Sequence, residues 1–171
     1  MDIKKILLIS LIAVAIVASV SAVSAGLFDG LFGGEESQDN AIEIDHITFN
    51  TTNVTKFELL NSSEESGASI DWYVDENDTG YNVYIGNLSG VVDAEFPEMS
   101  DAFKEGQGIE SLPTQTVNGI VVYTASANSG KHVGEARYIS YVENRDLDTF
   151  VEFSSPDPNE TAKMVSTLDF K

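Results

Sequence analysis

Asparagine is the residue type whose spacing in this sequence most clearly suggests chemistry. Six of the eleven asparagines stand two residues before a serine or threonine, the N-x-S/T pattern that accepts N-linked glycans. These candidate glycosylation sites are Asn50, Asn53, Asn61, Asn77, Asn87 and Asn159. The pattern occurs more often than the serine and threonine content would give by chance, which predicts an N-glycosylated surface protein. Asn, Ser and Thr are also common in polar turns, which leaves a plain structural role open for each site.

A second candidate is a weak cation site in residues 75–80. Asp75, Asn77 and Thr79 place oxygen ligands at the alternate positions that begin an EF-hand loop, and Gly80 takes the glycine position. The twelfth position, where a bidentate glutamate belongs, is Gly86. The flanking residues alternate as strands do, so a plain hairpin turn is the alternative. Weakly bound Ca²⁺ is the only cofactor that the sequence suggests.

The remaining reactive residue types form no catalytic pattern in the sequence. His46 and His132 lack the H-E-x-x-H spacing of a hydrolytic zinc site, and no G-x-S-x-G motif is present. The chain has no Cys, which excludes disulfides, thiolate metal sites and cysteine nucleophiles. We expect no catalytic residues and a non-enzymatic binding or structural function. The alternative is an extracellular hydrolase whose polar groups meet only in the folded chain.

The first 25 residues have the pattern of an export signal. Lys4 and Lys5 precede an uncharged run over residues 6–25, and the small side chains of Val23 and Ala25 suit a cleavage site. An uncleaved membrane anchor is the alternative, because about 20 apolar residues span a bilayer. Either interpretation places the rest of the chain outside the cell, secreted or on the extracellular face of the membrane.

The charge of the chain excludes one class of partner. The sequence has 9 Lys and Arg against 28 Asp and Glu, a formal net charge of −19, and residues 26–171 carry 7 against 27. Nucleic-acid binding needs clustered basic residues, so we expect no nucleic-acid partner. A partner in the cell envelope or at the cell surface is the expectation. Membrane contact is expected only through the N-terminal segment, if that segment is uncleaved.

Composition divides the chain into three parts. Residues 1–25 are the signal peptide or membrane anchor, and residues 26–40 form a flexible Gly-rich and acidic linker in which Gly-Leu-Phe occurs twice. Residues 41–171 are long enough to form a single α+β domain with its own core.

The elements that must position these candidates are mostly strands. Apolar residues alternate or cluster as in strands at residues 42–49, 57–59, 70–74, 81–85, 117–127, 133–142 and 150–153. Helical spacing occurs at residues 96–103 and 158–168, the second with Pro158 in its first turn. The order β-β-β-β-α-β-β-β-α predicts an α+β fold, an antiparallel sheet of six to seven strands covered by two short helices. An N-terminal hydrophobic helix is expected before it.

The C-terminal end carries a resemblance to known proteins. Residues 153–164 read FSSPDPNETAKM and residues 167–170 read TLDF. This ending, the leader and the Gly-Leu-Phe-Gly-Gly linker resemble those of small exported archaeal proteins of unknown function. The order of elements is also similar to the PsbP/Mog1 type of α-β-α sandwich. The resemblance implies an exported domain with a binding or accessory role and assigns no catalytic residue.

Overall fold

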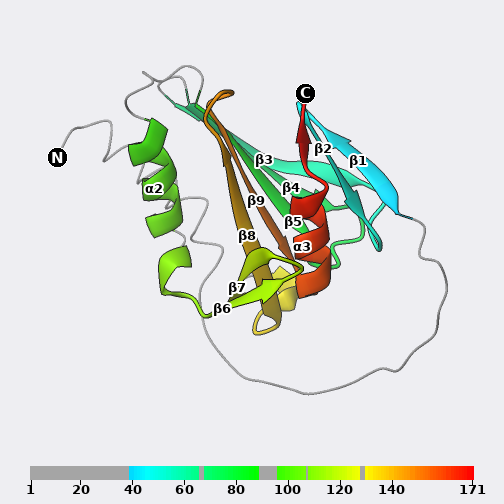
Figure 1. The fold of residues 1–171 in the computed structure, drawn as a ribbon. Helices are drawn as coiled ribbons and strands as arrows, with labels where there is room; N and C mark the ends of the chain where they lie inside the picture. Colours follow the sequence, from blue (N-terminus) through cyan, green and yellow to red (C-terminus); the bar gives the residue numbers. More distant parts are fainter. Residues whose placement is uncertain (1–38, 66–67, 89–95, 107, 128–129) are drawn as a thin grey trace, which may run out of the picture.

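The structure is a computed structural model that describes residues 39–65, 68–88, 96–106, 108–127 and 130–171 (Figure 1). The expected signal segment, its hydrophobic helix and nearly all of the expected linker lie outside the described residues. Neither α-helix of the described part has the length and apolar character that a membrane span requires.

Five strands precede the first described helix. They are β1 (Asn40–Ile44), β2 (Ile47–Thr51), β3 (Phe57–Glu65), β4 (Ala68–Asp75) and β5 (Asn82–Asn87). The helix α2 (Phe96–Gly106) and the 3-10 turn η2 (Ile109–Ser111) follow. The remaining elements are β6 (Thr114–Val117), β7 (Ile120–Ser126), η3 (Gly130–His132), β8 (Ala136–Asn144), β9 (Thr149–Ser155), α3 (Pro158–Ser166) and β10 (Asp169–Phe170).

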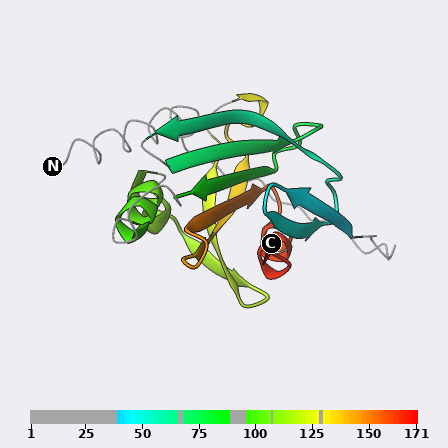
Figure 2. The ribbon, with the colours of Figure 1, turned by 90° about the horizontal axis from the view of Figure 1, so that it is seen from above.

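Seven of the strands form one antiparallel sheet in the order β3-β4-β5-β9-β8-β7-β6 (Figure 2). The central pair, β5 and β9, joins segments far apart in the sequence, with Val83 opposite Phe153. β3 and β6 are the edges of this sheet. The predicted α+β class and antiparallel sheet are therefore confirmed.

A second, three-stranded sheet in the order β1-β2-β10 was not foreseen from the sequence. Residues 42–49, expected as one strand segment, fold as a hairpin that turns at Asp45 and His46. Asp45 has φ 51°, a left-handed conformation that Asp tolerates better than most residues. β10 pairs with the other side of β2, with Phe170 opposite Ile47.

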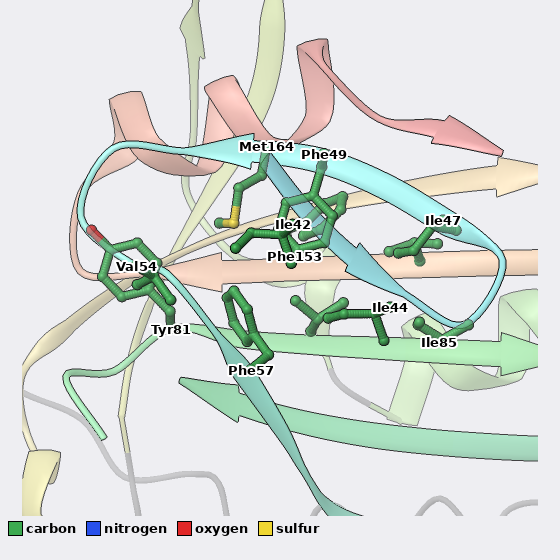
Figure 3. Close-up of a cluster of buried hydrophobic side chains, with 12 residues drawn as sticks. Ile42, Ile44, Ile47, Phe49, Val54, Phe57, Tyr81, Ile85, Phe153 and Met164 are labelled. Atoms are coloured by element: carbon green, nitrogen blue, oxygen red, sulfur yellow. The ribbon is translucent and has the colours of Figure 1, made fainter. Parts of the chain in front are cut away.

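The larger apolar core lies between the small sheet, α3 and one face of the large sheet (Figure 3). Phe49 of β2 contacts Phe57 and Phe153 edge-on, with ring centroids 5.7 and 4.9 Å apart. Met164 of α3 is fully buried in the same cluster. Since side chains alternate along a strand, Val151 and Phe153 face this core while Phe150 and Glu152 face the opposite side.

The helix α3 begins as the sequence predicts. The Asp157 carboxylate caps it by accepting a hydrogen bond of 2.8 Å from the main-chain N–H of Asn159. Pro158 follows at the start of the helix, where its missing N–H is not needed. Ala162 is buried, and Val165 and Leu168 pack against the core.

The helix α2 covers the opposite face of the large sheet from α3, so that the sheet lies between the two helices in Figure 1. Its buried Phe103 packs with Ile70, Tyr84 and Phe150, which form the second core cluster. The predicted helical spacing at residues 96–103 is thus confirmed, and the face that it covers carries the site described below.

The expected order of elements is wrong in three places. Residues 117–127 were expected as one strand, but the chain reverses at Asn118 and Gly119 and divides the segment between β6 and β7. Both turn residues have positive φ, 51° and 86°, as in the tight hairpin turns that Asn-Gly favours. Among the described residues, five strands and not four precede α2, and β10 follows α3.

Candidate functional site

The candidate site is a row of four paired side chains on the α2 face of the large sheet. Trp72 of β4 pairs with Tyr84 of β5, Tyr84 pairs with Glu152 of β9, and Glu152 pairs with Tyr141 of β8. Side chains of directly paired residues project from the same face and lie close together. We call these four residues, Trp72, Tyr84, Glu152 and Tyr141, the Glu152 row.

Aromatic rings surround the acid in this row. The rings of Trp72 and Tyr84 stack, with centroids 5.4 Å apart and planes 12° from parallel. Phe103 of α2 lies 6.3 Å from Tyr84 and 6.0 Å from Tyr141, measured between ring centroids. Phe150, which precedes Glu152 by two residues on the same face, packs 4.6 Å from Phe103. Glu152 is therefore placed in an apolar and aromatic environment.

Gly86 makes room for this packing. A Cβ atom at Gly86 would lie 2.1 Å from the Phe150 ring, far inside van der Waals contact. Gly86 pairs directly with Phe150, so the ring lies over the glycine of the neighbouring strand. The missing side chain lets Phe150 reach Phe103 and close this end of the aromatic cluster.

Glu152 is the unusual member of the row. Its side chain is 3 % exposed, and no donor among the described residues hydrogen-bonds to Oε2. Burial raises the pKa of Glu152 to about 8, because a charged carboxylate loses its hydration in an apolar environment. The same burial raises the pKa of the Tyr84 phenol, so both groups stay protonated at neutral pH.

A second acid on this face, Glu143, is fully partnered. It accepts hydrogen bonds from Ser100 Oγ at 2.6 Å and from Lys104 Nζ at 3.0 Å, which join α2 to β8. Burial opposes its ionisation, but the hydrogen bonds from Ser100 and Lys104 outweigh burial and lower the pKa of Glu143. Lys104 Nζ also lies 5.4 Å from the centroid of the Tyr141 ring, a cation–π distance.

The arrangement of the row suits binding. A buried carboxyl group next to aromatic rings can receive a donor or a cation from a ligand, while the rings contact its apolar part. The four residues contain no pairing of a nucleophile with a base, which acyl transfer would require.

In the turn that the sequence suggested as a cation site, the Asp75 carboxylate is hydrogen-bonded to main-chain groups of the turn itself. The Asp75 carboxylate is buried and accepts hydrogen bonds from the main-chain N–H groups of Thr79, Gly80 and Tyr81, at 2.8 to 3.1 Å. Asn77 and Thr79 are exposed. Within the described residues, no group of three or more His, Cys, Asp and Glu side chains could hold a metal ion. Weak Ca²⁺ binding here stays a prediction.

Basic side chains of the β7–β8 connection and of β8 contact the same turn. Lys131 Nζ lies 3.0 Å from Asp78 Oδ2, and His132 Nε2 lies 2.7 Å from the Asp78 carbonyl oxygen. His132 Nδ1 is 2.8 Å from Glu135 Oε2, so both ring nitrogens are engaged. The Arg137 guanidinium lies against Gly80, where a Cβ would be 2.5 Å away. Through these contacts, the His132 side chain joins the β7–β8 connection to the turn at Asp78.

The other histidine forms a chain that is similar to a catalytic triad. His46 Nδ1 is 2.5 Å from Asp45 Oδ2, and Nε2 is 3.2 Å from Thr149 Oγ1. Thr149 is only 1 % exposed, and its hydroxyl donates to the Leu147 carbonyl at 3.0 Å. Because the Thr149 hydroxyl contacts both His46 and Leu147, this set of contacts joins the β1–β2 turn to β9. No motif in the sequence connects Thr149 with His46.

The six candidate glycosylation sites differ in exposure. Four asparagines are exposed, namely Asn53, Asn61, Asn77 and Asn159. Asn50 and Asn87 lie within strands and are partly buried. Asn61 pairs with Trp72 and therefore stands at the outer end of the Glu152 row, on the edge strand β3.

Sequence reasoning missed Glu152, because it is one of 28 acidic residues. A signal was present, however, since Glu152 is the one charged residue of β9, a strand buried at all seven positions. Comparisons with protein-family models, with curated proteins and with solved structures give no match. The proposed function therefore rests on the sequence and the geometry of this chain.

Proposed function

We propose that this chain is an exported, N-glycosylated α+β protein that binds a ligand or partner at the cell surface and does not catalyse a reaction. The observation that carries binding is the buried Glu152 carboxyl group, whose Oε2 has no donor among the described residues. Buried polar atoms are almost always partnered, so an unpartnered one among aromatic rings favours a binding site.

The surface of the domain supports the glycosylated, exported part of this proposal. Four of the six sequon asparagines are exposed, as attachment of a glycan requires. Residues 26–171 carry 27 acidic against 7 basic residues, which suits a hydrated outer surface. The resemblance to small exported archaeal proteins agrees with this proposal and stays a prediction.

The test is the mass and the N-terminus of the full chain, purified from the cells that produce it. We expect a mass above that of the bare chain and a mature N-terminus near residue 26. Ser63→Ala destroys the Asn61 sequon and should remove the mass of one glycan. Ser62→Ala, the matched control, keeps that sequon and should leave the mass of the glycan in place.

A mass equal to that of the bare chain would contradict glycosylation. Recovery of the whole chain in the cytoplasmic fraction would contradict export. An intact N-terminus on protein found at the membrane would instead favour the uncleaved anchor.

A further inference from the structure

We propose that the α2 face of the large sheet binds an organic cation, an ammonium or guanidinium group on an apolar body, with the Glu152 carboxylate as its counter-ion. The inference rests on the proposed binding function and names the class of ligand. Trp72, Tyr84 and Tyr141 would contact the cation and its apolar part.

Glu152 Oε2 has no hydrogen-bond partner among the described residues. A buried carboxyl oxygen without a donor forfeits the hydrogen bonds that it makes in water. The basic residue nearest to this face in α2, Lys104, is already engaged, at 2.9 Å from Asp101 and 3.0 Å from Glu143. No donor in the described part of the chain satisfies Oε2, so a donor from a ligand would complete the site.

The charges on this face favour a positively charged ligand. Glu152 and Glu143 lie on the same face of the sheet, so an anion would meet two acids there. Aromatic rings attract cations through their negative faces. Lys104 Nζ, 5.4 Å from the Tyr141 centroid, shows that a cation is accommodated on the rings of this row. The net charge of −19 attracts cations to the protein from a distance.

Binding of a cation should be coupled to release of a proton from Glu152. A cation beside Glu152 favours the carboxylate, so binding below pH 8 should expel the Glu152 proton. The titratable side chains that face Glu152 are Tyr84 and Tyr141 on its two sides, then Glu143, Lys104 and Asp101. The pKa values of both tyrosines are raised by burial, and Glu143 and Lys104 form an ion pair. Glu152 is therefore the group that releases the proton.

The experiment is a titration of the full, purified protein with cyclohexylammonium. Trp72 is the only tryptophan and lies in the row, so its fluorescence reports binding directly. Cyclohexanol and cyclohexanecarboxylate serve as neutral and anionic probes of the same shape. We expect saturable binding of cyclohexylammonium, with binding of the other two at least tenfold weaker.

The variant Glu152→Gln keeps the shape of the side chain and removes its charge. We expect it to weaken cyclohexylammonium binding at least tenfold at pH 8. Glu64→Gln, at an exposed acid of the edge strand β3, is the matched control and should change the dissociation constant less than twofold.

A second measurement needs no variant. The apparent affinity of the unaltered protein should fall about tenfold per pH unit below pH 8, because only the ionised acid binds the cation. Calorimetry in two buffers of different ionisation enthalpy should show release of close to one proton per cation at pH 6. A merely structural Glu152 would give neither result.

Three outcomes would overturn the inference: no saturable binding, equal binding by Glu152→Gln, or equal binding of cyclohexanol. None of these outcomes bears on export or glycosylation, because those proposals are tested by the mass and the N-terminus of the protein. Conversely, an unglycosylated chain that binds cyclohexylammonium would contradict the proposed surface glycoprotein and retain the cation site.

Discussion

The α3 face and the α2 face of the large sheet are built from alternate residues of the same strands, yet they bury different kinds of side chain. On the α3 face, β9 contributes Val151 and Phe153 to a cluster that is almost wholly apolar. On the α2 face, the same strand contributes Phe150 and Glu152. The α3 face therefore stabilises the fold, whereas the α2 face keeps a polar group that stability alone does not require.

The largest expected effect comes from the α3 face. Phe153→Ala should lower the free energy of unfolding by about 4 kcal/mol, because it leaves a cavity beside Phe49 at the centre of the core. Urea unfolding followed by circular dichroism measures the change. Leu59→Ala, on the exposed edge strand, is the control and should cost under about 0.5 kcal/mol. Equal losses for both variants would contradict the assignment of the core.

The second effect concerns pH and the α2 face. With the pKa of Glu152 raised to about 8 in the folded state, the unfolded chain ionises first as pH rises. This residue should therefore lower stability by about 3 kcal/mol between pH 5 and pH 8. Chemical unfolding of Glu152→Gln across this range should lack that loss, whereas Glu64→Gln should keep it. Parallel curves for the unaltered protein and Glu152→Gln would show that Glu152 is solvated.

A smaller effect is expected at the glycine of the α2 face. Gly86→Ala should lower the free energy of unfolding by about 2 kcal/mol, because the new methyl group displaces the Phe150 ring. The double variant Gly86→Ala with Phe150→Leu should lose less than the two single variants added together. Additive losses in thermal unfolding would mean that the two residues are not in contact.

The smallest effect concerns the attachment of α2. Ser100→Ala removes the hydroxyl that donates to Glu143 at 2.6 Å and should cost about 1 kcal/mol. It should also raise the pKa of Glu143, since one of the hydrogen bonds that favour its carboxylate is lost. Titration by NMR measures that pKa. Ser166→Ala, at an exposed hydroxyl of α3, should leave the pKa of Glu143 unchanged.

Local patterns in the sequence predicted the elements that local forces determine. The alternation in residues 70–74 and 81–85 predicted the β4–β5 hairpin, and Pro158 marked the start of α3. The Asn118–Gly119 turn was missed because Val117 is the one apolar residue of β6, so the residues before the turn show no strand alternation. β10 was missed because two residues carry no periodicity.

The candidate site could not be predicted from local pattern. Glu152 becomes unusual only because β9 pairs with β5 on one side and β8 on the other, which places aromatic rings on both flanks. The pairing of β5 with β9 joins segments separated by about half of the domain, and no periodicity within β9 encodes it. The lone charge in a strand of otherwise uncharged residues was the one clue in the sequence itself.

The small sheet places the last strand of the chain beside the second. β10 completes this sheet by pairing with β2, and the Lys171 N–H donates to the His46 carbonyl at 2.8 Å. The β1–β2 hairpin therefore lacks one neighbour until residues 169–170 pair with β2. Such long-range closure slows folding. The β1–β2 hairpin can form from neighbouring residues, whereas the three-stranded sheet is completed only when β10 reaches it.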